Sequence, residues 1–259
     1  MSNNFDVIFN NIFEKNLWGD PDSRSGSGSN MESTRVIRVK IPELIDHYKI
    51  RTIVDAPCGD LFWIKTLFRK FNLKGIKYIG LDIVSNIVEQ NKLEFHSSDF
   101  NFHEVDLTKG PIPCADLIIS RDCLLHFSYK NILAILTNFK ASGSKYLLVS
   151  TYTNATRENY DVAEFSIGGR ALNLQRSPFK LKQPLQIIVE GCTEGNYEYT
   201  DKSLALWKLS QINLNKLRVA VKIISFKNMG IIYFNKGKRK SIKVKNGLIK
   251  VVKKILVNR

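Results

Sequence analysis

The stretch RTIVDAPCGD, residues 51–60, joins a short apolar run to a turn that contains a proline and a glycine. The apolar run predicts a buried strand that ends at Asp55. Gly59 allows the backbone of the turn to approach a ligand, and a helix beginning near Leu61 would present its N-terminus there. The dinucleotide-binding pattern GxGxxG is absent, so the turn by itself fits equally well a structural role in which Asp55 and Asp60 cap it.

Strand and helix patterns continue to alternate beyond this turn. Apolar runs predict strands over residues 77–84, 101–107, 115–120 and 145–152, and amphipathic runs predict helices over residues 61–71, 84–92 and 130–139. Such alternation is typical of a parallel sheet covered by helices on both faces. Two later apolar runs, 185–192 and 203–210, are close enough to pair antiparallel. The predicted fold is therefore a Rossmann-like α/β sheet, mostly parallel, with an antiparallel terminal hairpin.

Three segments lie outside this alternation. Residues 1–18 predict an amphipathic helix followed by a Gly/Ser loop over 20–30, and a further helix is expected over 34–48, where Pro42 would break it. Residues 153–184 are rich in Asn, Arg, Gly and Pro and predict a long loop or lid. The expected organisation is N-terminal helices with a cap loop in residues 1–50, a ligand-binding domain in residues 51–212 and a basic extension in residues 213–259.

The net charge of +15 is concentrated at one end of the chain. Residues 213–259 contain 14 Lys or Arg and no Asp or Glu, whereas residues 1–212 hold 25 basic and 24 acidic side chains. One face of a helix in the last segment would carry Val244, Leu248, Val251, Val252 and Ile255. We favour an anionic membrane surface as the partner of such a basic amphipathic helix. Nucleic acid is the weaker alternative because no RNA-binding module is visible, and a helix docked on the protein itself is the third.

Cysteine and histidine spacing gives no sign of a metal centre or a disulfide framework. The four cysteines form no CxxC pair, and the four histidines are not spaced as a chelating set. The N-terminus lacks the features of a signal peptide, and no run approaches the ~20 apolar residues that span a bilayer. We therefore expect a cytoplasmic protein without a bound metal, either soluble or held peripherally at the inner face of a membrane.

Four predicted strands carry an acid at or just beyond their carboxyl ends: Asp55, Asp82, Asp106 and Asp122. Ligands of open parallel sheets bind at these ends. A carboxylate there can accept two hydrogen bonds from a ribose diol, and such charge-assisted bonds are the stronger kind. Asp99 is the alternative to Asp106 as the acid that belongs to the third of these strands.

These segments also carry a resemblance. DAPCGDLFW, YIGLDIV, HEVDLTKGPIP, ADLIISRDCLLHF and KYLLVSTY, in this order, resemble the successive motifs of class I S-adenosylmethionine-dependent methyltransferases. A closer match is a subgroup with a DxPCGDxxW turn, an RDxLxH segment at Arg121–His126 and an RxLNLxxxPF segment at Arg170–Phe179. The resemblance covers roughly residues 15–210. Its motifs are specific for the cofactor and poor guides to the acceptor, because this fold serves many substrates.

The resemblance implies a place for each part of the cofactor. Asp55 and Gly59 should line the methionine part, Asp82 should bind the ribose hydroxyls, and Asp106 should lie by the adenine amine with Leu107 packed on the ring. The other residues expected at the cofactor are Pro57, Ile83 and Arg121. Pro57 departs from the commonest pattern, which often has glycine there, and makes the turn stiffer.

Methyl acceptors of this fold bind beyond the fourth strand, where Asp122 and His126 follow one another. His126 is the preferred general base and Asp122 the second choice, or the group that orients His126. Arg157, Arg170 and Trp18 are the expected acceptor-binding residues, since Arg suits carboxylate and phosphate. We expect O-methylation of a small acceptor, or of a glycan or lipid-linked one. A nucleic-acid methyltransferase and a non-catalytic cofactor-binding protein are the alternatives.

Overall fold

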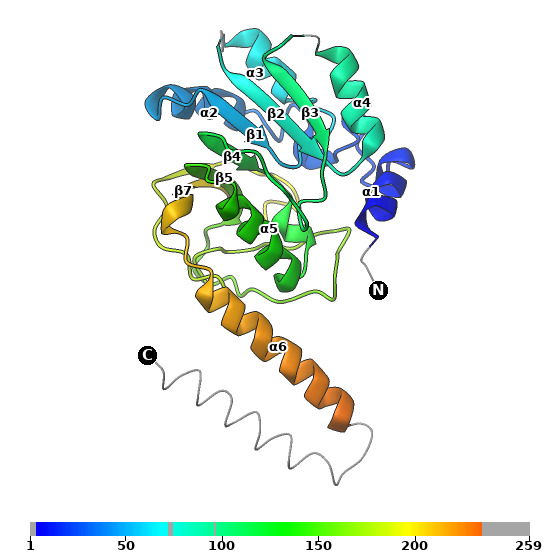
Figure 1. Cartoon of the computed structure of the whole chain (residues 1–259), viewed down its shortest axis with the longest axis vertical. Coiled ribbons are helices and arrows are strands. Elements are labelled where there is room, and N and C mark those ends of the chain that lie inside the picture. Colours follow the sequence, from blue (N-terminus) through cyan, green and yellow to red (C-terminus); the bar gives the residue numbers. More distant parts are fainter. Residues whose placement is uncertain (1–3, 72–74, 96, 235–259) are drawn as a thin grey trace. The chain divides into compact units, whose positions relative to one another are not determined.

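The computed structural model describes residues 4–71, 75–95 and 97–234 (Figure 1). The chain divides into two compact units, Met1–Asn213 and Leu214–Arg259. Helix α6, Asn215–Phe234, belongs to the second unit. The predicted apolar face from Val244 to Ile255 lies outside the described residues. Among the helices that are described, none is long and apolar enough to span a membrane.

A single seven-stranded sheet forms the centre of the first unit, in the order β3-β2-β1-β4-β5-β7-β6. β1 to β5 run parallel, whereas β7 is antiparallel to β5 and pairs with β6 in a terminal hairpin. The predicted Rossmann-like fold is confirmed. The strands are β1 (Thr52–Asp55), β2 (Lys77–Asp82), β3 (Phe100–Glu104), β4 (Leu117–Ser120), β5 (Tyr146–Tyr152), β6 (Gln186–Val189) and β7 (Lys202–Lys208).

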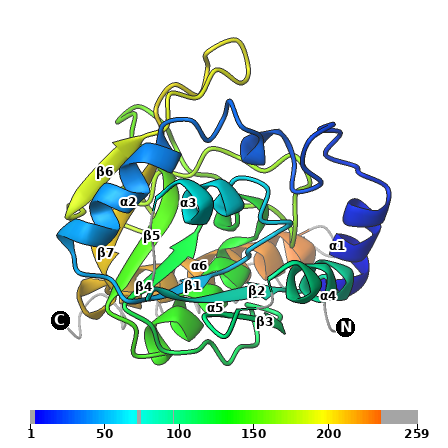
Figure 2. The ribbon, with the colours of Figure 1, turned by 90° about the horizontal axis from the view of Figure 1, so that it is seen from above.

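Helices cover both faces of this sheet, as Figure 2 shows for α2 and α3 on one side and α5 on the other. The apolar side chains of α2 and α3 enter one core cluster with residues of β1, β2, β4 and β5, including Ile37, Leu67 and Leu148. The helices of this unit are α1 (Phe5–Glu14), α2 (Ile37–His47), α3 (Ile64–Lys70), α4 (Ser85–Glu94) and α5 (Tyr129–Ala141).

Two expectations about these elements were wrong. Pro42 does not break its helix, because α2 runs continuously from Ile37 to His47 with the proline inside. Its apolar residues stay buried against the core, and this packing outweighs the local cost of the proline. The third strand ends at Glu104, earlier than predicted, so Asp106 and Leu107 belong to the loop that follows.

The order of the strands reverses between β1 and β4, which are neighbours in the sheet although two strands separate them in sequence. Such a switch point leaves a crevice at the carboxyl ends of the two strands, and ligands of open α/β sheets bind there. The turn after β1 and the loop after β4 therefore form the floor of any binding site.

Candidate cofactor and acceptor site

A cavity of about 530 Å³ lies over the switch point. This is an ordinary size for a small-molecule site. Its walls come from the loops after β1, β2, β3, β4 and β5, from α1 and from the Gly/Ser loop. Apart from Asp99, the alternative to Asp106, every residue that the sequence suggested for the cofactor, the acceptor or catalysis lines this cavity. They are Trp18, Asp55, Pro57, Gly59, Asp82, Ile83, Asp106, Leu107, Arg121, Asp122, His126, Arg157 and Arg170.

Two buried carboxylates stand at the ends of β1 and β2. Oδ2 of Asp55 accepts a hydrogen bond from the Tyr78 hydroxyl at 2.6 Å. Asp82 accepts one backbone N–H on each oxygen, from Gly59 at 3.0 Å and from Val84 at 3.0 Å, and this fixes the carboxylate beside the turn. Burial raises the pKa of Asp55 to about 7 and that of Asp82 to about 6. Both groups therefore favour a cationic ligand that would compensate their charge.

Asp60 in the same turn anchors the Gly/Ser loop. The hydroxyls of Ser23 and Ser25 and the backbone N–H of Arg24 all donate to its carboxylate, at 2.9 to 3.2 Å. Ser25 Oγ in turn accepts the N–H of Asp60, and a Cβ on Gly59 would collide with that hydroxyl. Asp60 Oδ1 also accepts the N–H of Phe62 at 3.2 Å within the turn, but it does not cap α3, and the loop that it holds was not predicted.

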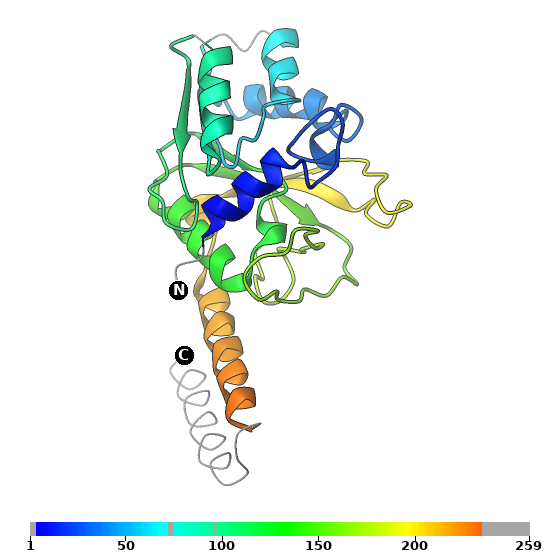
Figure 3. The ribbon, with the colours of Figure 1, turned by 90° about the vertical axis from the view of Figure 1, so that its right-hand side faces the viewer.

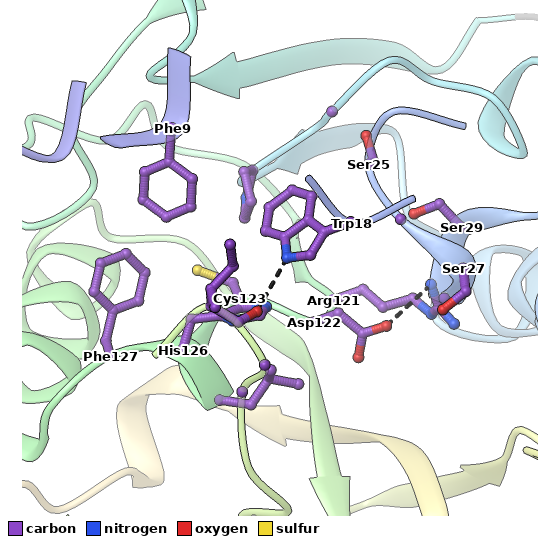
Figure 4. A pocket seen from close by; sticks show the side chains of 18 of the residues that line it. Phe9, Trp18, Ser25, Ser27, Ser29, Arg121, Asp122, Cys123, His126 and Phe127 are labelled. Atoms are coloured by element: carbon purple, nitrogen blue, oxygen red, sulfur yellow. Dashed lines mark hydrogen bonds and ion pairs between the residues drawn. The ribbon is translucent and has the colours of Figure 1, made fainter. Parts of the chain in front are cut away.

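Side chains of the N-terminal segment line the cavity from the other side, among them Phe9 and Trp18 (Figure 4). Figure 3 shows the course of this segment, with α1 in dark blue. Phe13 of α1 packs with Val84 and Ile87 beside the end of β2. Trp18 donates its indole N–H to the carbonyl of Ile167 at 3.0 Å, which joins this segment to the long loop after β5. Trp18 and the Gly/Ser loop thus both line the cavity.

Asp106 lies beyond β3 with much of its hydrogen-bonding capacity already used. Oδ1 accepts from the N–H and the hydroxyl of Thr108, and Oδ2 pairs with Lys109 at 2.9 Å. Although partial burial raises its pKa, these bonds lower the pKa of Asp106 overall. The carboxylate remains ionised at the cavity wall next to the buried Leu107.

The loop after β4 begins with two charged residues whose partners come from the terminal hairpin. Arg121 donates to Glu190 at 2.7 Å, and both side chains are buried. Asp122 accepts from Lys202 at 2.7 Å, and its backbone N–H donates to Ser150 Oγ. Figure 4 shows the ion pair between Arg121 and Asp122 as a dashed line. Burial raises the pKa of Asp122, but the charges of Lys202 and Arg121 hold it well below its usual range. Asp122 is therefore a fixed anion and a poor proton acceptor.

His126 ends a short 3₁₀ turn, Leu124–His126, after this loop. Its Nδ1 lies 2.8 Å from the carbonyl oxygen of Ser166. A carbonyl can only accept, so Nδ1 carries the proton and Nε2 has a free lone pair in the neutral ring. Ser166, and not Asp122, orients the ring, which lies between Trp18 and Phe165 at 5.6 and 5.7 Å. Burial lowers the pKa of His126, so the ring is neutral at physiological pH.

The two arginines expected to bind the acceptor are engaged within the protein. Arg157 makes a bidentate pair with Asp201, with N–O distances of 2.7 and 2.8 Å. Arg170 donates to the carbonyl oxygens of Tyr160, Leu125 and Phe127. Both side chains line the cavity, but their donors hold the long loop 153–184 and the hairpin in place.

The fold of this chain is similar to that of solved proteins, whereas its sequence has no match. No protein-family model and no curated protein sequence matches this sequence. Magnesium protoporphyrin IX methyltransferase from Synechocystis PCC 6803, solved with bound SAH, matches the structure with a TM-score of 0.51 and 13% identity over 79% of this chain and 97% of its own. This chain has the Rossmann-like fold of a SAM-dependent methyltransferase.

Two further solved structures are similar to this fold. The pyocyanin biosynthetic protein PhzM matches with a TM-score of 0.54 and 14% identity, over 80% of this chain and 64% of its own. Human N-acetylserotonin methyltransferase, solved with SAM, has a TM-score of 0.49 and 17% identity over 68% of this chain. This chain spans 52% of the human protein's length.

Sequence reasoning missed several residues of the site. Lys202 and Glu190 lie in or beside the apolar runs that predicted the last two strands. A charged residue next to such a run was the available signal, because a charge buried there needs a partner. Tyr152, the last residue of β5, gave no signal, because a tyrosine is common in strands. Only the cross-strand register places it next to Lys202.

Proposed function

We propose that this chain is an S-adenosylmethionine-dependent methyltransferase that methylates an oxygen of its acceptor. The observation that carries the proposal is the set of three carboxylates, Asp55, Asp82 and Asp106, at successive strand ends around one cavity in a methyltransferase fold. The resemblance of the sequence motifs to class I methyltransferases supports the same conclusion independently of the fold.

The residues present fit this cofactor. The sulfonium and ammonium of S-adenosylmethionine are cations. Burial raises the pKa of Asp55 and Asp82, so a cation beside them would stabilise their ionised forms. Asp82 has a lone pair left on each oxygen for a ribose diol. Three serines of the Gly/Ser loop line the wall near the switch point (Figure 4). Ser25 and Ser27 donate to Asp60 and Glu194, which leaves the Ser29 hydroxyl as a neutral donor for a carboxylate. Leu107 and Ile83 supply apolar surface for an adenine ring.

The bound cofactor would supply an activated methyl group for an in-line displacement. This chain's own residues would position the acceptor oxygen and remove its proton. His126 Nε2 is the proton acceptor, because its neutral tautomer presents a lone pair beside the loop after β4. Asp122, held ionised by Lys202, would orient the acceptor hydroxyl.

Methyl transfer itself is the test. The full chain is incubated with methyl-labelled cofactor and a small-molecule and glycan extract, and both labelled product and S-adenosylhomocysteine are measured. We expect equal amounts of the two, and loss of both in Asp82→Ala. A folded chain that binds cofactor and forms neither product would be a non-catalytic binding protein.

The basic extension, residues 213–259, supports the proposal that the protein lies at a membrane surface. Its 14 basic and no acidic residues suit an anionic membrane surface, where each basic residue contributes about 1 kcal/mol. A cytoplasmic enzyme held at the inner face of a membrane would meet lipid-linked acceptors there. Nucleic acid remains the second candidate for the extension, and retention on RNA that falls steeply with salt would favour it.

A further inference from the structure

The described cationic side chains that line the cavity all form hydrogen bonds with other groups of the protein. Five Lys or Arg line it, and each donates to protein oxygens. Arg24 donates to two backbone carbonyls and Arg170 to three. Arg121, Arg157 and Lys202 each donate to a carboxylate, which belongs to Glu190, Asp201 and Asp122, respectively. Each of these five cations is thus already engaged in the protein, and an acceptor that carries a phosphate or carboxylate would also face the unpaired carboxylates described below.

A buried tyrosine at the cavity provides a neutral hydrogen-bond donor. Tyr152 is 7% exposed and lines the cavity, and its hydroxyl has no hydrogen-bond partner among the described residues. In the sheet it pairs with Lys202, and it lies two residues beyond Ser150, which binds Asp122. These residues share one face, so the Tyr152 side chain stands beside Asp122. Burial raises its pKa, and the hydroxyl remains an O–H donor.

Two carboxylates at the rim add hydrogen-bond acceptors. Glu158 and Glu198 line the cavity, and neither carboxylate has a hydrogen bond or ion pair within the described parts of the chain. Tyr160 beside them is 60% exposed and offers a flat aromatic face. Carboxylates bind hydroxyl groups by charge-assisted hydrogen bonds, and an aromatic face packs against the apolar face of a ring.

A neutral hydroxyl suits this lining, because it can accept a hydrogen bond from the Tyr152 O–H and can donate one to a carboxylate or to His126 Nε2. A protonated amine has no lone pair with which to attack a methyl group, and a phosphate or carboxylate meets like charge at Asp122, Glu158 and Glu198. We propose, on the basis of the proposed methyltransferase function, that the acceptor is an uncharged, hydroxyl-rich ring such as a glycosyl unit, and that Tyr152 selects it.

Fractionation by charge tests this directly. A cell extract is separated on anion- and cation-exchange resins into anionic, cationic and neutral pools, and each pool is incubated with the full chain and methyl-labelled cofactor. We expect the label in the neutral pool, on material that periodate oxidation degrades. Label chiefly in the anionic or cationic pool would overturn the acceptor class and leave methyl transfer standing. No label in any pool, with cofactor binding intact by calorimetry, would overturn both.

Tyr152→Phe separates specificity from folding. The substitution removes only the hydroxyl, so we expect KM for the labelled neutral acceptor to rise tenfold or more while cofactor affinity is unchanged. Tyr146→Phe is the matched control, because Tyr146 lies at the other end of the same strand, packed on Tyr48. An unchanged KM in folded Tyr152→Phe would remove Tyr152 from the acceptor site.

Discussion

The ammonium of Lys202 lies 2.7 Å from Oδ2 of Asp122, although 80 residues separate the two in sequence. Lys202 is almost fully buried, and burial alone would lower its pKa, yet Asp122 raises the pKa of this ammonium above its usual value. The pair joins the loop after β4 to the terminal hairpin, and so it fixes one wall of the cavity.

Breaking this pair should be costly. Lys202→Met leaves a largely buried carboxylate with one cation, Arg121 at 3.4 Å, and we expect a loss of about 3 kcal/mol in the free energy of unfolding. The double variant Lys202→Met with Asp122→Asn should lose at least about 1 kcal/mol less than the sum of the two single variants. Urea denaturation of the four proteins measures both. Additive losses would show that the two side chains do not stabilise one another.

His126 sets the expected pH dependence of turnover. Because burial lowers its pKa below 6.5, the acid limb of kcat should follow a group in that range, with a plateau through neutral pH. His126→Ala should reduce turnover by ~10²–10⁴ at neutral pH with cofactor affinity unchanged. A pH–rate profile of both proteins decides the matter. A variant that keeps full turnover would leave positioning as the source of catalysis.

The Gly/Ser loop should depend on Gly28. A Cβ there would lie 2.7 Å from Oδ2 of Asp122 and 3.5 Å from the ammonium of Lys202, so Gly28→Ala must push the loop away from the ion pair. We expect weaker cofactor binding and faster proteolysis within residues 20–30. Gly168→Ala is the control for proteolysis, because its Cβ would meet nothing within 4 Å. Equal proteolysis of the two variants would mean that the loop is not held at this point.

Much of the fold was predictable, because hydrophobic periodicity depends on neighbouring residues. The parallel strands, the terminal hairpin and the acids at the strand ends all followed from short apolar runs and their endings. The partners of the charges were not predictable, since Arg121–Glu190 and Asp122–Lys202 depend on strand order and register. Arg157 and Arg170 illustrate this, because nothing local shows that their donors are occupied by Asp201 and by backbone carbonyls.

The basic extension can be tested with vesicles. The full chain should cosediment with vesicles that contain anionic lipid, and binding should weaken as salt is raised. Val251→Asp with Val252→Asp should reduce binding, because it disrupts the predicted apolar face with only a small change in net charge. Neutral vesicles are the control. Protein that stays in the supernatant with anionic vesicles at low salt would exclude the membrane as its partner.

Calorimetric titration of the full chain with S-adenosylmethionine is the direct test of cofactor binding in this cavity. We expect one-to-one binding that weakens as the pH falls below about 6, because protonation of Asp82 removes the charge that attracts the cofactor. Asp82→Ala should lose about 1.5–3 kcal/mol of binding free energy. Absence of binding to the folded chain at neutral pH, or affinity unchanged in folded Asp82→Ala, would contradict the assignment of this cavity to the cofactor.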